Sequence, residues 1–517
     1  MNVPAEPLPL ERFYERSRES FEDIVRYADS EEAACMSHSE LERELEKRGR
    51  ELMRRIMQDH LDRRSPGEAK GPVRDSGGDE RTRVRLQERA LETVFGTVFV
   101  ERAGYCRQGA DSLHPLDGEL NLPVERYSLE LRRRVAEEAA KSSFDETLES
   151  VEKTTGAHVP KRQLEEMVLR AARDFDGFYE TRRIDPREET SSLLVISADG
   201  KGVVMRPEDL REKTREAAAK RKHKMGARLS KGEKTNAKRM ATVAAVYTVA
   251  PFVRSPEDII REQGPHLPGP SPPRPEQKRV WAKLEKDPEK VIEEAFDEAL
   301  CRDPGREKKW VALVDGNKTQ IRILRRLAGK KGIELTIIVD FVHVTEYLWK
   351  AGRVFHSESG QGLENWVRHR LLEILRGKAG YVAGGMKRSA TLRKISEKAR
   401  KPVDNCARYL LNHTPYLRYD QYLARGLPIA TGVIEGACRH LVKDRMEVTG
   451  ARWSLKGAEA VLKLRALRAS HDFEQYWAFH EAREHERNHQ ALYEDGLVPP
   501  TVKPYLTRKQ PQLKRVK

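Results

Sequence analysis

The stretch IELTIIVDFVH at residues 333–343 is the strongest indication of the fold of this chain. Its apolar run ends in Asp340, and His343 follows three residues later. A continuous apolar run of this length is typical of a strand that is covered on both faces. Two earlier runs also end in an acid: LLVISAD at 193–199 and WVALVD at 310–315. Three such strands, each with a carboxylate at its C-terminal end, predict an α/β sheet with acids along one edge.

The composition favours a polyanionic partner. The chain has 517 residues, 35% of them charged and 38% hydrophobic, and its net charge is +15. That balance is typical of proteins that bind nucleic acid, although a basic surface without such a partner is the alternative. No apolar run is long enough to span a membrane, and the N-terminus has no secretory pattern. The five cysteines are scattered without a CxxC pair, so we expect no disulfide or zinc site and a cytoplasmic location.

The N-terminal part predicts helices around a few strands. Residues 1–80 contain a helical pattern at 41–61 and then a Gly- and Pro-rich stretch at 62–80, which predicts a mobile linker. Residues 83–107 combine β-branched and aromatic residues around a glycine, as strands joined by a turn do. We expect a DNA-binding region at 81–185.

Two helices separated by GAHVP are predicted at residues 144–155 and 161–175. This spacing favours a helix–turn–helix, with Ser143 or Asp145 as the N-cap of the first helix. An ordinary helical hairpin remains the alternative. A DNA-reading second helix would expose three residues at its N-terminal end: Lys161, Arg162 and Gln163.

The half of the chain after residue 190 begins with the strand LLVISAD, and GKGVVM then predicts a Gly turn into a second strand. A basic insertion follows at 206–240, in which residues 211–240 contain 12 Lys or Arg and 3 Glu. Such a one-signed run favours phosphate binding, whereas a solvated helix face is the alternative. The candidate DNA contacts here are Lys220, Arg221, Lys222 and Lys224.

The remaining elements complete a mixed sheet. A third strand at 241–251 precedes a Pro-rich insertion at 252–309, within which residues 276–300 are predicted to be helical. The helix expected at 319–331 connects two strands, so at least one strand pair should be parallel. We expect a catalytic core at 190–351, a helical insertion at 352–427, a return to the core at 428–490 and a basic disordered tail at 491–517.

The acids at the strand ends predict a metal site. Asp199, Asp315 and Glu435 (the last in TGVIEG) would repel one another in one pocket unless cations lay between them. Two Mg²⁺ ions, which Mn²⁺ can replace, would suit such a carboxylate set. The alternative for each single Asp is a structural role, as the N-cap of a helix or as a turn residue. His343 is expected to pack and bond to a neighbouring acid, because no second His or Cys pair completes a zinc set.

Several segments together resemble bacterial insertion-sequence transposases of the DDE type, closest to the ISKra group and more distantly to the Mutator-like group. The matching segments are ISADGKGV, ALVDGNKTQ, VDFVHVTEYLW and TGVIEGACRHLVKDRM with TGARWS, preceded by FGTVFVERAGY, HPLDGELNLP and SFDETLES. The resemblance covers about residues 80–490. It implies a ribonuclease-H-like catalytic domain with a helical insertion before the final acid.

The resemblance implies that Asp199, Asp315 and Glu435 are the catalytic metal ligands. In Mutator-like relatives the second acid follows the fourth strand, which favours Asp315, and the next strand carries a C/DxxH signature. Asp340 and His343 fill that signature, and Asp340 is the reserve candidate for the second ligand. Further candidate DNA contacts follow Glu435, for which solvent exposure or helix packing is the alternative: Lys443, Arg445, Arg452 and Trp453.

The resemblance therefore predicts a DNA transposase. It would bind the inverted repeats at the ends of its element, cut there with Mg²⁺ and join the freed 3′-hydroxyl to target DNA. Double-stranded DNA would be its partner, no membrane or nucleotide cofactor is expected, and the need to pair two ends predicts a homodimer or larger oligomer. The alternatives are a structure-specific nuclease of the same fold and a non-catalytic DNA-binding protein derived from a transposase.

Overall fold

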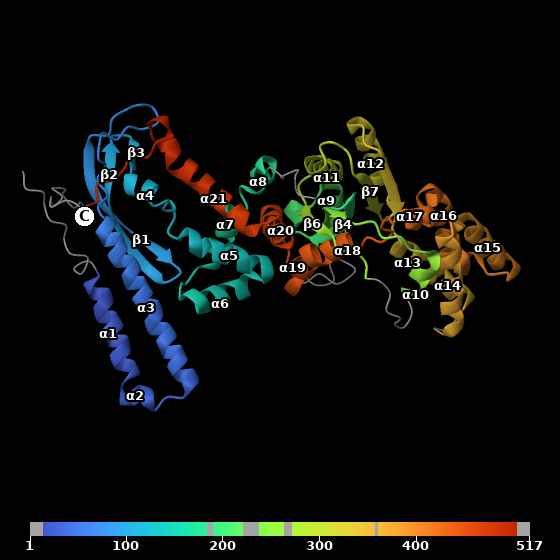
Figure 1. Cartoon of the computed structure of the whole chain (residues 1–517), viewed down its shortest axis with the longest axis horizontal. Coiled ribbons are helices and arrows are strands. Elements are labelled where there is room, and N and C mark those ends of the chain that lie inside the picture. The colour runs from blue at the N-terminus through green and yellow to red at the C-terminus, as the bar shows by residue number, and fades with distance from the viewer. Residues whose placement is uncertain (1–13, 183–189, 221–236, 263–270, 357–359, 504–517) are drawn as a thin grey trace, which may run out of the picture. The chain divides into compact units, whose positions relative to one another are not determined.

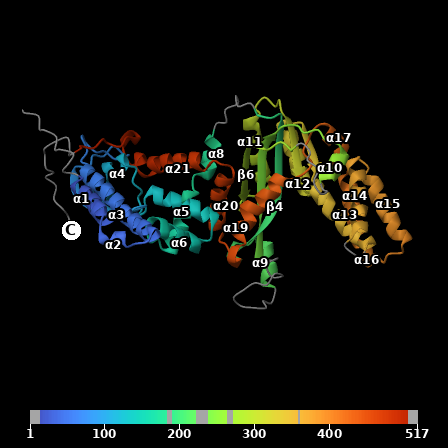
Figure 2. The same cartoon turned by 60° about the horizontal axis from the view of Figure 1, so that its bottom comes forward.

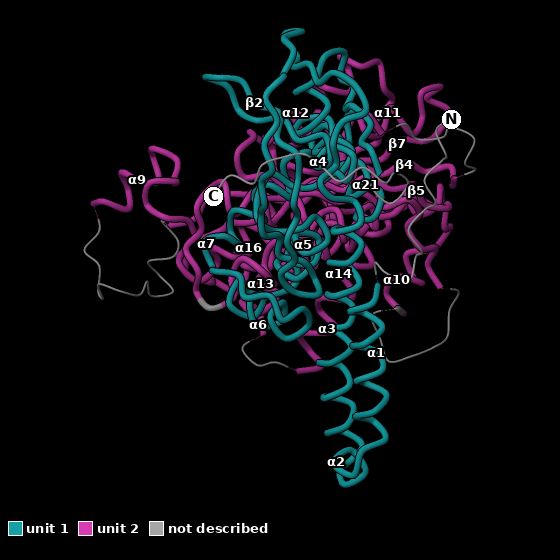
Figure 3. The backbone as a smooth tube through the Cα atoms, turned by 90° about the vertical axis from the view of Figure 1, so that its left-hand side faces the viewer, with its two compact units in different colours: residues 1–180, 473–517 teal, residues 181–472 magenta. Residues whose placement is uncertain are grey.

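A computed structural model of the chain describes residues 14–182, 190–220, 237–262, 271–356 and 360–503. The chain forms two compact units (Figure 3). The first combines Met1–Glu180 with Phe473–Lys517, and the second is Thr181–Asp472. Both contain helices and strands, so the predicted α/β multidomain class is confirmed at that level. Within the described ranges no helix is both long and apolar enough to cross a membrane.

A five-stranded mixed sheet forms the centre of the second unit (Figure 1). Its order is β6-β5-β4-β7-β8. Strand β5 is antiparallel to both β4 and β6, whereas β7 is parallel to β4 and β8 is parallel to β7. The strands are β4 (Leu193–Val204), β5 (Lys238–Val249), β6 (Glu276–Lys283), β7 (Lys309–Val314) and β8 (Leu335–Val339). The mixed sheet is thus confirmed, as is the predicted parallel pair, which α12 (Lys318–Lys331) connects.

Continuous apolar runs explain why β4, β5 and β7 lie at the centre. Residues 193–196 of β4 and 311–313 of β7 are fully buried, as a strand covered on both faces must be. Helix α11 (Pro288–Arg302) packs on β4 and β5, and α18 (Gly432–Ala437) packs on β4, β5 and β6. Helix α20 (Leu455–Ala469) packs against β6.

Two predictions for this sheet are wrong. The Gly turn expected after Asp199 does not form, because Gly200 and Gly202 continue β4 and pair with Thr242 and Met240 of β5. Residues 276–283, predicted to be helical, are the edge strand β6. The prediction failed because β6 contains charged residues where a buried strand normally has apolar ones. Arg279 and Lys283 are buried because they pair with Glu298 and Glu294. Ion pairs of this kind cannot be seen in the local sequence.

The predicted helical insertion consists of helices that follow β8. They form one bundle beside the sheet in both views of the chain (Figures 1 and 2). The helices are α13 (Phe341–Phe355), α14 (Gln361–Leu375), α15 (Ala379–Leu392), α16 (Glu397–His413) and α17 (Tyr419–Ala424). The helical region thus begins directly after β8.

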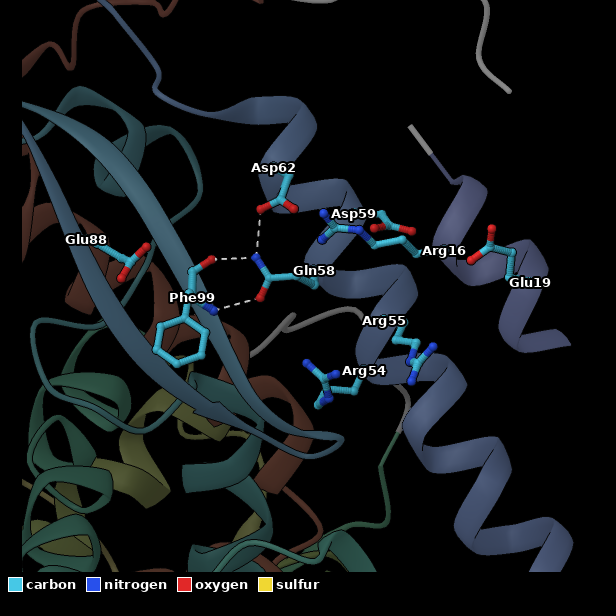
Figure 4. Close-up of a pocket in the computed structure, with 9 residues that line it drawn as sticks. All are labelled: Arg16, Glu19, Arg54, Arg55, Gln58, Asp59, Asp62, Glu88 and Phe99. Carbon is cyan, nitrogen blue, oxygen red and sulfur yellow. Dashed lines mark hydrogen bonds between the residues drawn. The ribbon is translucent and has the colours of Figure 1, made fainter. Parts of the chain in front are cut away.

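The first unit contains a three-stranded antiparallel sheet and two groups of helices. Helix α3 (His38–Arg64) confirms the helical prediction for residues 41–61 and packs on the sheet. Gln58 accepts a hydrogen bond of 2.8 Å from the Phe99 N–H and donates one of 2.9 Å to the Phe99 carbonyl (Figure 4). The sheet is β1 (Arg83–Thr93), β2 (Gly96–Arg107) and β3 (Ala110–Leu113), and the other principal helices are α1 (Glu15–Ala28), α5 (Leu129–Lys141), α6 (Phe144–Thr155), α7 (Lys161–Ala171) and α21 (Phe473–Asn488).

The predicted linker at 62–80 and the first part of the predicted tail at 491–517 pack on each other. Lys70 N–H bonds the Pro500 carbonyl at 2.9 Å, and Val73 is buried beside Tyr493. The prediction of a mobile linker and a disordered tail is therefore wrong for these residues, because each segment supplies the backbone partners of the other. Residues 504–517 lie outside the described ranges.

The C-terminal boundary of the core also differs from the expected one. The core was expected to extend to residue 490, but α21 belongs to the first unit. Tyr476 of this helix donates a hydrogen bond of 2.5 Å to the Ala171 carbonyl, and His480 bonds Asp174 at 2.7 Å. Contacts between residues more than 300 positions apart set this boundary, and composition carries no sign of them.

Candidate active site

Three of the predicted acids lie in one row across neighbouring parallel strands. Ser197 of β4 is paired with Leu313 of β7, so two residues further on Asp199 lies opposite Asp315. The next strand continues the row, because Val314 is paired with Val339 and the Asp340 N–H bonds the Val314 carbonyl at 2.8 Å. Strand register thus brings together acids that are up to 141 positions apart.

Asp340 is the most enclosed acid of this row. It is the N-cap of α13 and has no solvent exposure. Its carboxylate accepts four hydrogen bonds: from Val342 N–H (3.1 Å), Thr431 N–H (3.2 Å), the Thr431 hydroxyl (2.7 Å) and His343 Nδ1 (2.8 Å). Burial alone would raise the pKa of Asp340, but the bonds from His343 and Thr431 outweigh it and lower the pKa. The Asp340 carboxyl is therefore ionised, and its two oxygens already accept four hydrogen bonds.

His343 supplies a positive charge beside the row. Its hydrogen bond to Asp340 raises the pKa of the imidazole to about 9, and the charge of Asp315 adds to the effect. The prediction that His343 packs and bonds a neighbouring acid is therefore confirmed. Asp340 and His343 form an ion pair whose positive member lies close to Asp315.

Glu435 lies on α18, and the first residues of this helix are held by Asp340. The Thr431 hydroxyl that bonds Asp340 lies 3.4 Å from Glu435 Oε1. Burial raises the pKa of Glu435, and the negative charge of Asp340 raises it further. A carboxylate in this position is stabilised when a cation arrives.

Cys438 connects the same helix to β4. Its thiol donates a hydrogen bond of 3.3 Å to Asp199 Oδ2. The charges of Asp199 and Glu435 both act on this thiol, which follows Glu435 by about one helical turn. Burial raises the pKa of the Cys438 thiol, and the Asp199 charge raises it further, so the thiol stays protonated. Sequence reasoning treated Cys438 only as a scattered cysteine; its position three residues after Glu435 was the available signal.

Helix α16 holds the turn that carries Asp315. The Tyr409 hydroxyl bonds the Asp315 carbonyl at 2.8 Å, and His413 Nε2 lies 2.8 Å from the Gly316 carbonyl. Gly316 has φ +92°, and a Cβ there would lie 2.8 Å from the Tyr409 oxygen, so only glycine fits. Asp315 Oδ1 accepts a bond of 2.8 Å from Asn317 N–H. No local pattern indicates Tyr409, His413 or Thr431, because their contacts are with distant segments of the chain.

The residues that could hold a metal differ in how many oxygens they offer. One group in the described ranges is Asp340, His343 and Glu435, whose possible ligand atoms lie within 4.8 Å of one another. In this group the Asp340 oxygens already accept four bonds and His343 is cationic, which opposes a metal. Asp199 and Asp315 lie outside that group, and each accepts only local or weak bonds. Asp199 and Asp315 keep carboxylate positions open to a hard divalent cation such as Mg²⁺, and Glu435, whose Oε1 lies 3.4 Å from the Thr431 hydroxyl, would complete the ligand set.

A second acid and histidine group lies in the first unit. Asp174, His480 and Glu484 also have possible ligand atoms within 4.8 Å of one another. However, Arg487 bonds both Asp174 and Glu484, and Arg132 bonds Glu484. Two guanidinium groups already balance the two carboxylates, so this group is an ion-pair network that fixes α21.

The candidate DNA contacts on α7 are exposed. Lys161, Arg162 and Gln163 form its first turn, and the Ser143 capping box starts the preceding helix. Lys161 is paired with Asp145 at 2.6 Å, and Arg162 is paired with Glu166 at 3.3 Å. Gln163 makes no side-chain hydrogen bond to any described residue.

The candidate DNA contacts in the second unit differ in their exposure to solvent. Lys220, at the end of α9 (Glu212–Ala219), is exposed, whereas Arg221, Lys222 and Lys224 lie outside the described residues. Lys443 and Arg452 are exposed. Residues Cys438–Lys443 form a π-helical turn, so Lys443 does not follow Glu435 with α-helical spacing.

Arg445 and Trp453 are buried and pack on each other. The Arg445 guanidinium lies 4.8 Å from the centre of the Trp453 ring, and the indole N–H bonds the Met446 carbonyl at 3.1 Å. The Trp453 backbone pairs beside the end of β4, where its N–H bonds the Val204 carbonyl at 3.0 Å. Of the two roles left open for Trp453, helix packing is the one that this geometry supports.

Comparison with protein-family models finds no match to this chain, and comparison with curated proteins finds none either. The function must therefore be inferred from the acids at the sheet edge, from the helix that carries Glu435 and from the net charge of +15.

Proposed function

We propose that this protein is a DNA transposase whose second unit is a ribonuclease-H-like catalytic domain. The sheet order supports the fold: three antiparallel strands are followed by two parallel strands added on the side of the first. The function is supported by the strand register, which carries Asp199 and Asp315 toward the same sheet edge, and by the hydrogen bond from Cys438 to Asp199, which ties the helix of Glu435 to β4.

In this proposal Asp199, Asp315 and Glu435 hold Mg²⁺. When bound, Mg²⁺ activates an attacking oxygen and stabilises the leaving oxygen of a phosphodiester. Asp340 accepts bonds from Thr431 and thereby orients the start of α18. Protonated His343 offsets the negative charge beside Asp315 before a cation is bound. The same site would hydrolyse the phosphodiester at the element end and then support attack of the freed 3′-hydroxyl on target DNA.

Asp315 is preferred over Asp340 as the second ligand for a physical reason. A ligand must offer a lone pair to the metal, and Asp340 would have to give up bonds to Thr431 or His343 to do so. Asp315 would give up only the bond from its own turn.

The test is Mg²⁺-dependent cleavage of a duplex that carries the element end, followed by a strand-transfer assay. Asp199→Ala, Asp315→Ala and Glu435→Ala should lose cleavage while remaining folded, and Asp297→Ala, at an exposed acid on α11, serves as a matched control. Wild-type cleavage by Asp315→Ala with an inactive Asp340→Ala would make Asp340 the ligand. Cleavage without strand transfer would favour a structure-specific nuclease. DNA binding without cleavage of any end sequence would favour a non-catalytic DNA-binding protein.

A further inference from the structure

A pocket of about 740 Å³ lies in the second unit, between the edge strand β6, helix α18 and the end of α20. It is on the side of α18 away from the acids: Gly432, Val433 and Gly436 line it, whereas Cys438, one turn after Glu435, contacts Asp199. One short helix thus has the candidate metal site on one side and this pocket on the other.

The charge of the pocket is positive. Arg274, Lys278, His440 and His471 line it, and none of the described lining residues is an Asp or Glu. Arg274 and Lys278 form no ion pair with any described residue, so two permanent charges are available to a ligand. His440 of the lining bonds Asp444 at 2.9 Å. A concave surface with unpaired Arg and Lys side chains is suited to phosphate oxygens.

The floor of the pocket allows a close approach. Gly432 and Gly436 lie one turn apart on α18, and a Cβ added at either would meet no atom within 4 Å. The helix backbone is therefore bare where it faces the pocket. At the β6 wall of the pocket, the Val280 N–H donates to the Ser470 hydroxyl at 3.0 Å, and that hydroxyl lies 3.2 Å from the Val280 carbonyl.

We propose that this pocket binds backbone phosphates of the DNA strand that is cut at the acid edge. The proposal rests on the proposed function, because it takes the scissile phosphate to lie at Asp199 and Glu435. An α-helix is about 10 Å across, which corresponds to about three nucleotides at 3.4 Å each along one strand. The pocket would therefore fix the strand about three nucleotides from the cut.

Two kinds of variant of the full-length protein test the pocket. Arg274→Ala with Lys278→Ala removes the charges, and Gly436→Leu fills the space without changing any charge. Their matched controls are Lys387→Ala with Arg388→Ala, two exposed cations on α15, and Gly329→Leu, an open helical glycine on α12. Binding is measured in EDTA with a fluorescent element-end duplex at several salt concentrations.

The charge variant should bind about tenfold more weakly and lose about two from the slope of log affinity against log salt. Gly436→Leu should also bind more weakly, and both controls should match wild type. Ethylation of backbone phosphates about three nucleotides from the cut should interfere with binding of the wild-type protein, which needs no variant.

Wild-type binding and salt slope in both pocket variants, without ethylation interference at those phosphates, would overturn the pocket proposal even if wild type cleaves. Weakened binding in both variants of a protein that never cleaves with Mg²⁺ would instead overturn the proposed function and leave the pocket as a DNA site.

Discussion

The Thr431 hydroxyl donates a hydrogen bond of 2.7 Å to Asp340 Oδ2, although the two residues are 91 positions apart in the chain. Both are buried, and Thr431 directly precedes the helix that carries Glu435. This bond connects the end of β8 to the start of α18, so it should set the position of Glu435 relative to the acid row.

Thr431→Val should therefore lower cleavage by about tenfold or more with little change in DNA affinity. Loss of one donor to a buried carboxylate should also lower the free energy of unfolding by about 1–3 kcal/mol. Thr431→Ser keeps the hydroxyl and should restore most of both. Urea unfolding and single-turnover cleavage measure the two effects, and equal cleavage by the Val and Ser variants would contradict the positioning role.

Asp315 and Asp340 should differ in stability as well as in activity. Asp340→Asn removes the charge that His343 and Thr431 bond, and should lower the free energy of unfolding by about 3 kcal/mol or more. Asp315→Asn is only partly buried and should change it by less than about 1 kcal/mol. Urea denaturation of the two variants gives the comparison, and similar destabilisation would mean that Asp340 is less constrained than its four hydrogen bonds imply.

Trp453 should matter to folding more than its neighbour does. Trp453→Ala removes a ring that is 6% exposed and should cost about 3–5 kcal/mol of unfolding free energy. Exposed Arg452→Ala should cost little by comparison. Thermal unfolding followed by circular dichroism separates the two variants. A stable Trp453→Ala protein with weakened DNA binding would instead support a DNA contact.

The Asp174 network predicts acid sensitivity of the first unit. Burial of Asp174 would raise its pKa, but bonds from His480 and Arg487 outweigh burial and lower the pKa from 3.8 to about 2. Because the folded pKa is the lower one, this stabilisation is complete above pH 4 and is lost as the pH falls from about 4 to about 2. The carboxyl is only 10% exposed, so the contribution is roughly 2 kcal/mol. Asp174→Asn should be less stable at neutral pH and should lack this acid-dependent loss, which unfolding measured across this pH range would detect.

The salt bridge between Asp145 and Lys161 offers a test of the helix pair as a DNA reader. Asp145→Asn frees Lys161 and should strengthen DNA binding, whereas Lys161→Ala should weaken it. The pair is exposed, so stability should change by no more than about 0.5 kcal/mol. Fluorescence anisotropy with an element-end duplex measures both. Unchanged affinity in the two variants would mean that α6 and α7 are an ordinary helical hairpin.

The central strands and several helices follow from local sequence patterns. The apolar runs that end in Asp199, Asp315 and Asp340 can only be stable between two covered faces, and the helix between β7 and β8 requires those strands to be parallel. Helix α6 begins at Ser143 because its capping box is local. Such features depend on neighbouring residues, so they can be predicted from sequence.

The positions of the acids and the edge strand depend on contacts between distant segments. Strand register placed Asp199, Asp315 and Asp340 in one row, and bonds from Thr431 and Cys438 brought Glu435 to the same edge. Arg279 and Lys283 are buried in strand β6, although their charges led to the prediction of a helix there. Their burial is possible because each side chain pairs with a glutamate of α11. The IELTIIVDFVH stretch predicted a buried strand with an acid at its end, but only the folded chain shows that Asp340 is saturated with hydrogen bonds while Asp315 keeps oxygens open.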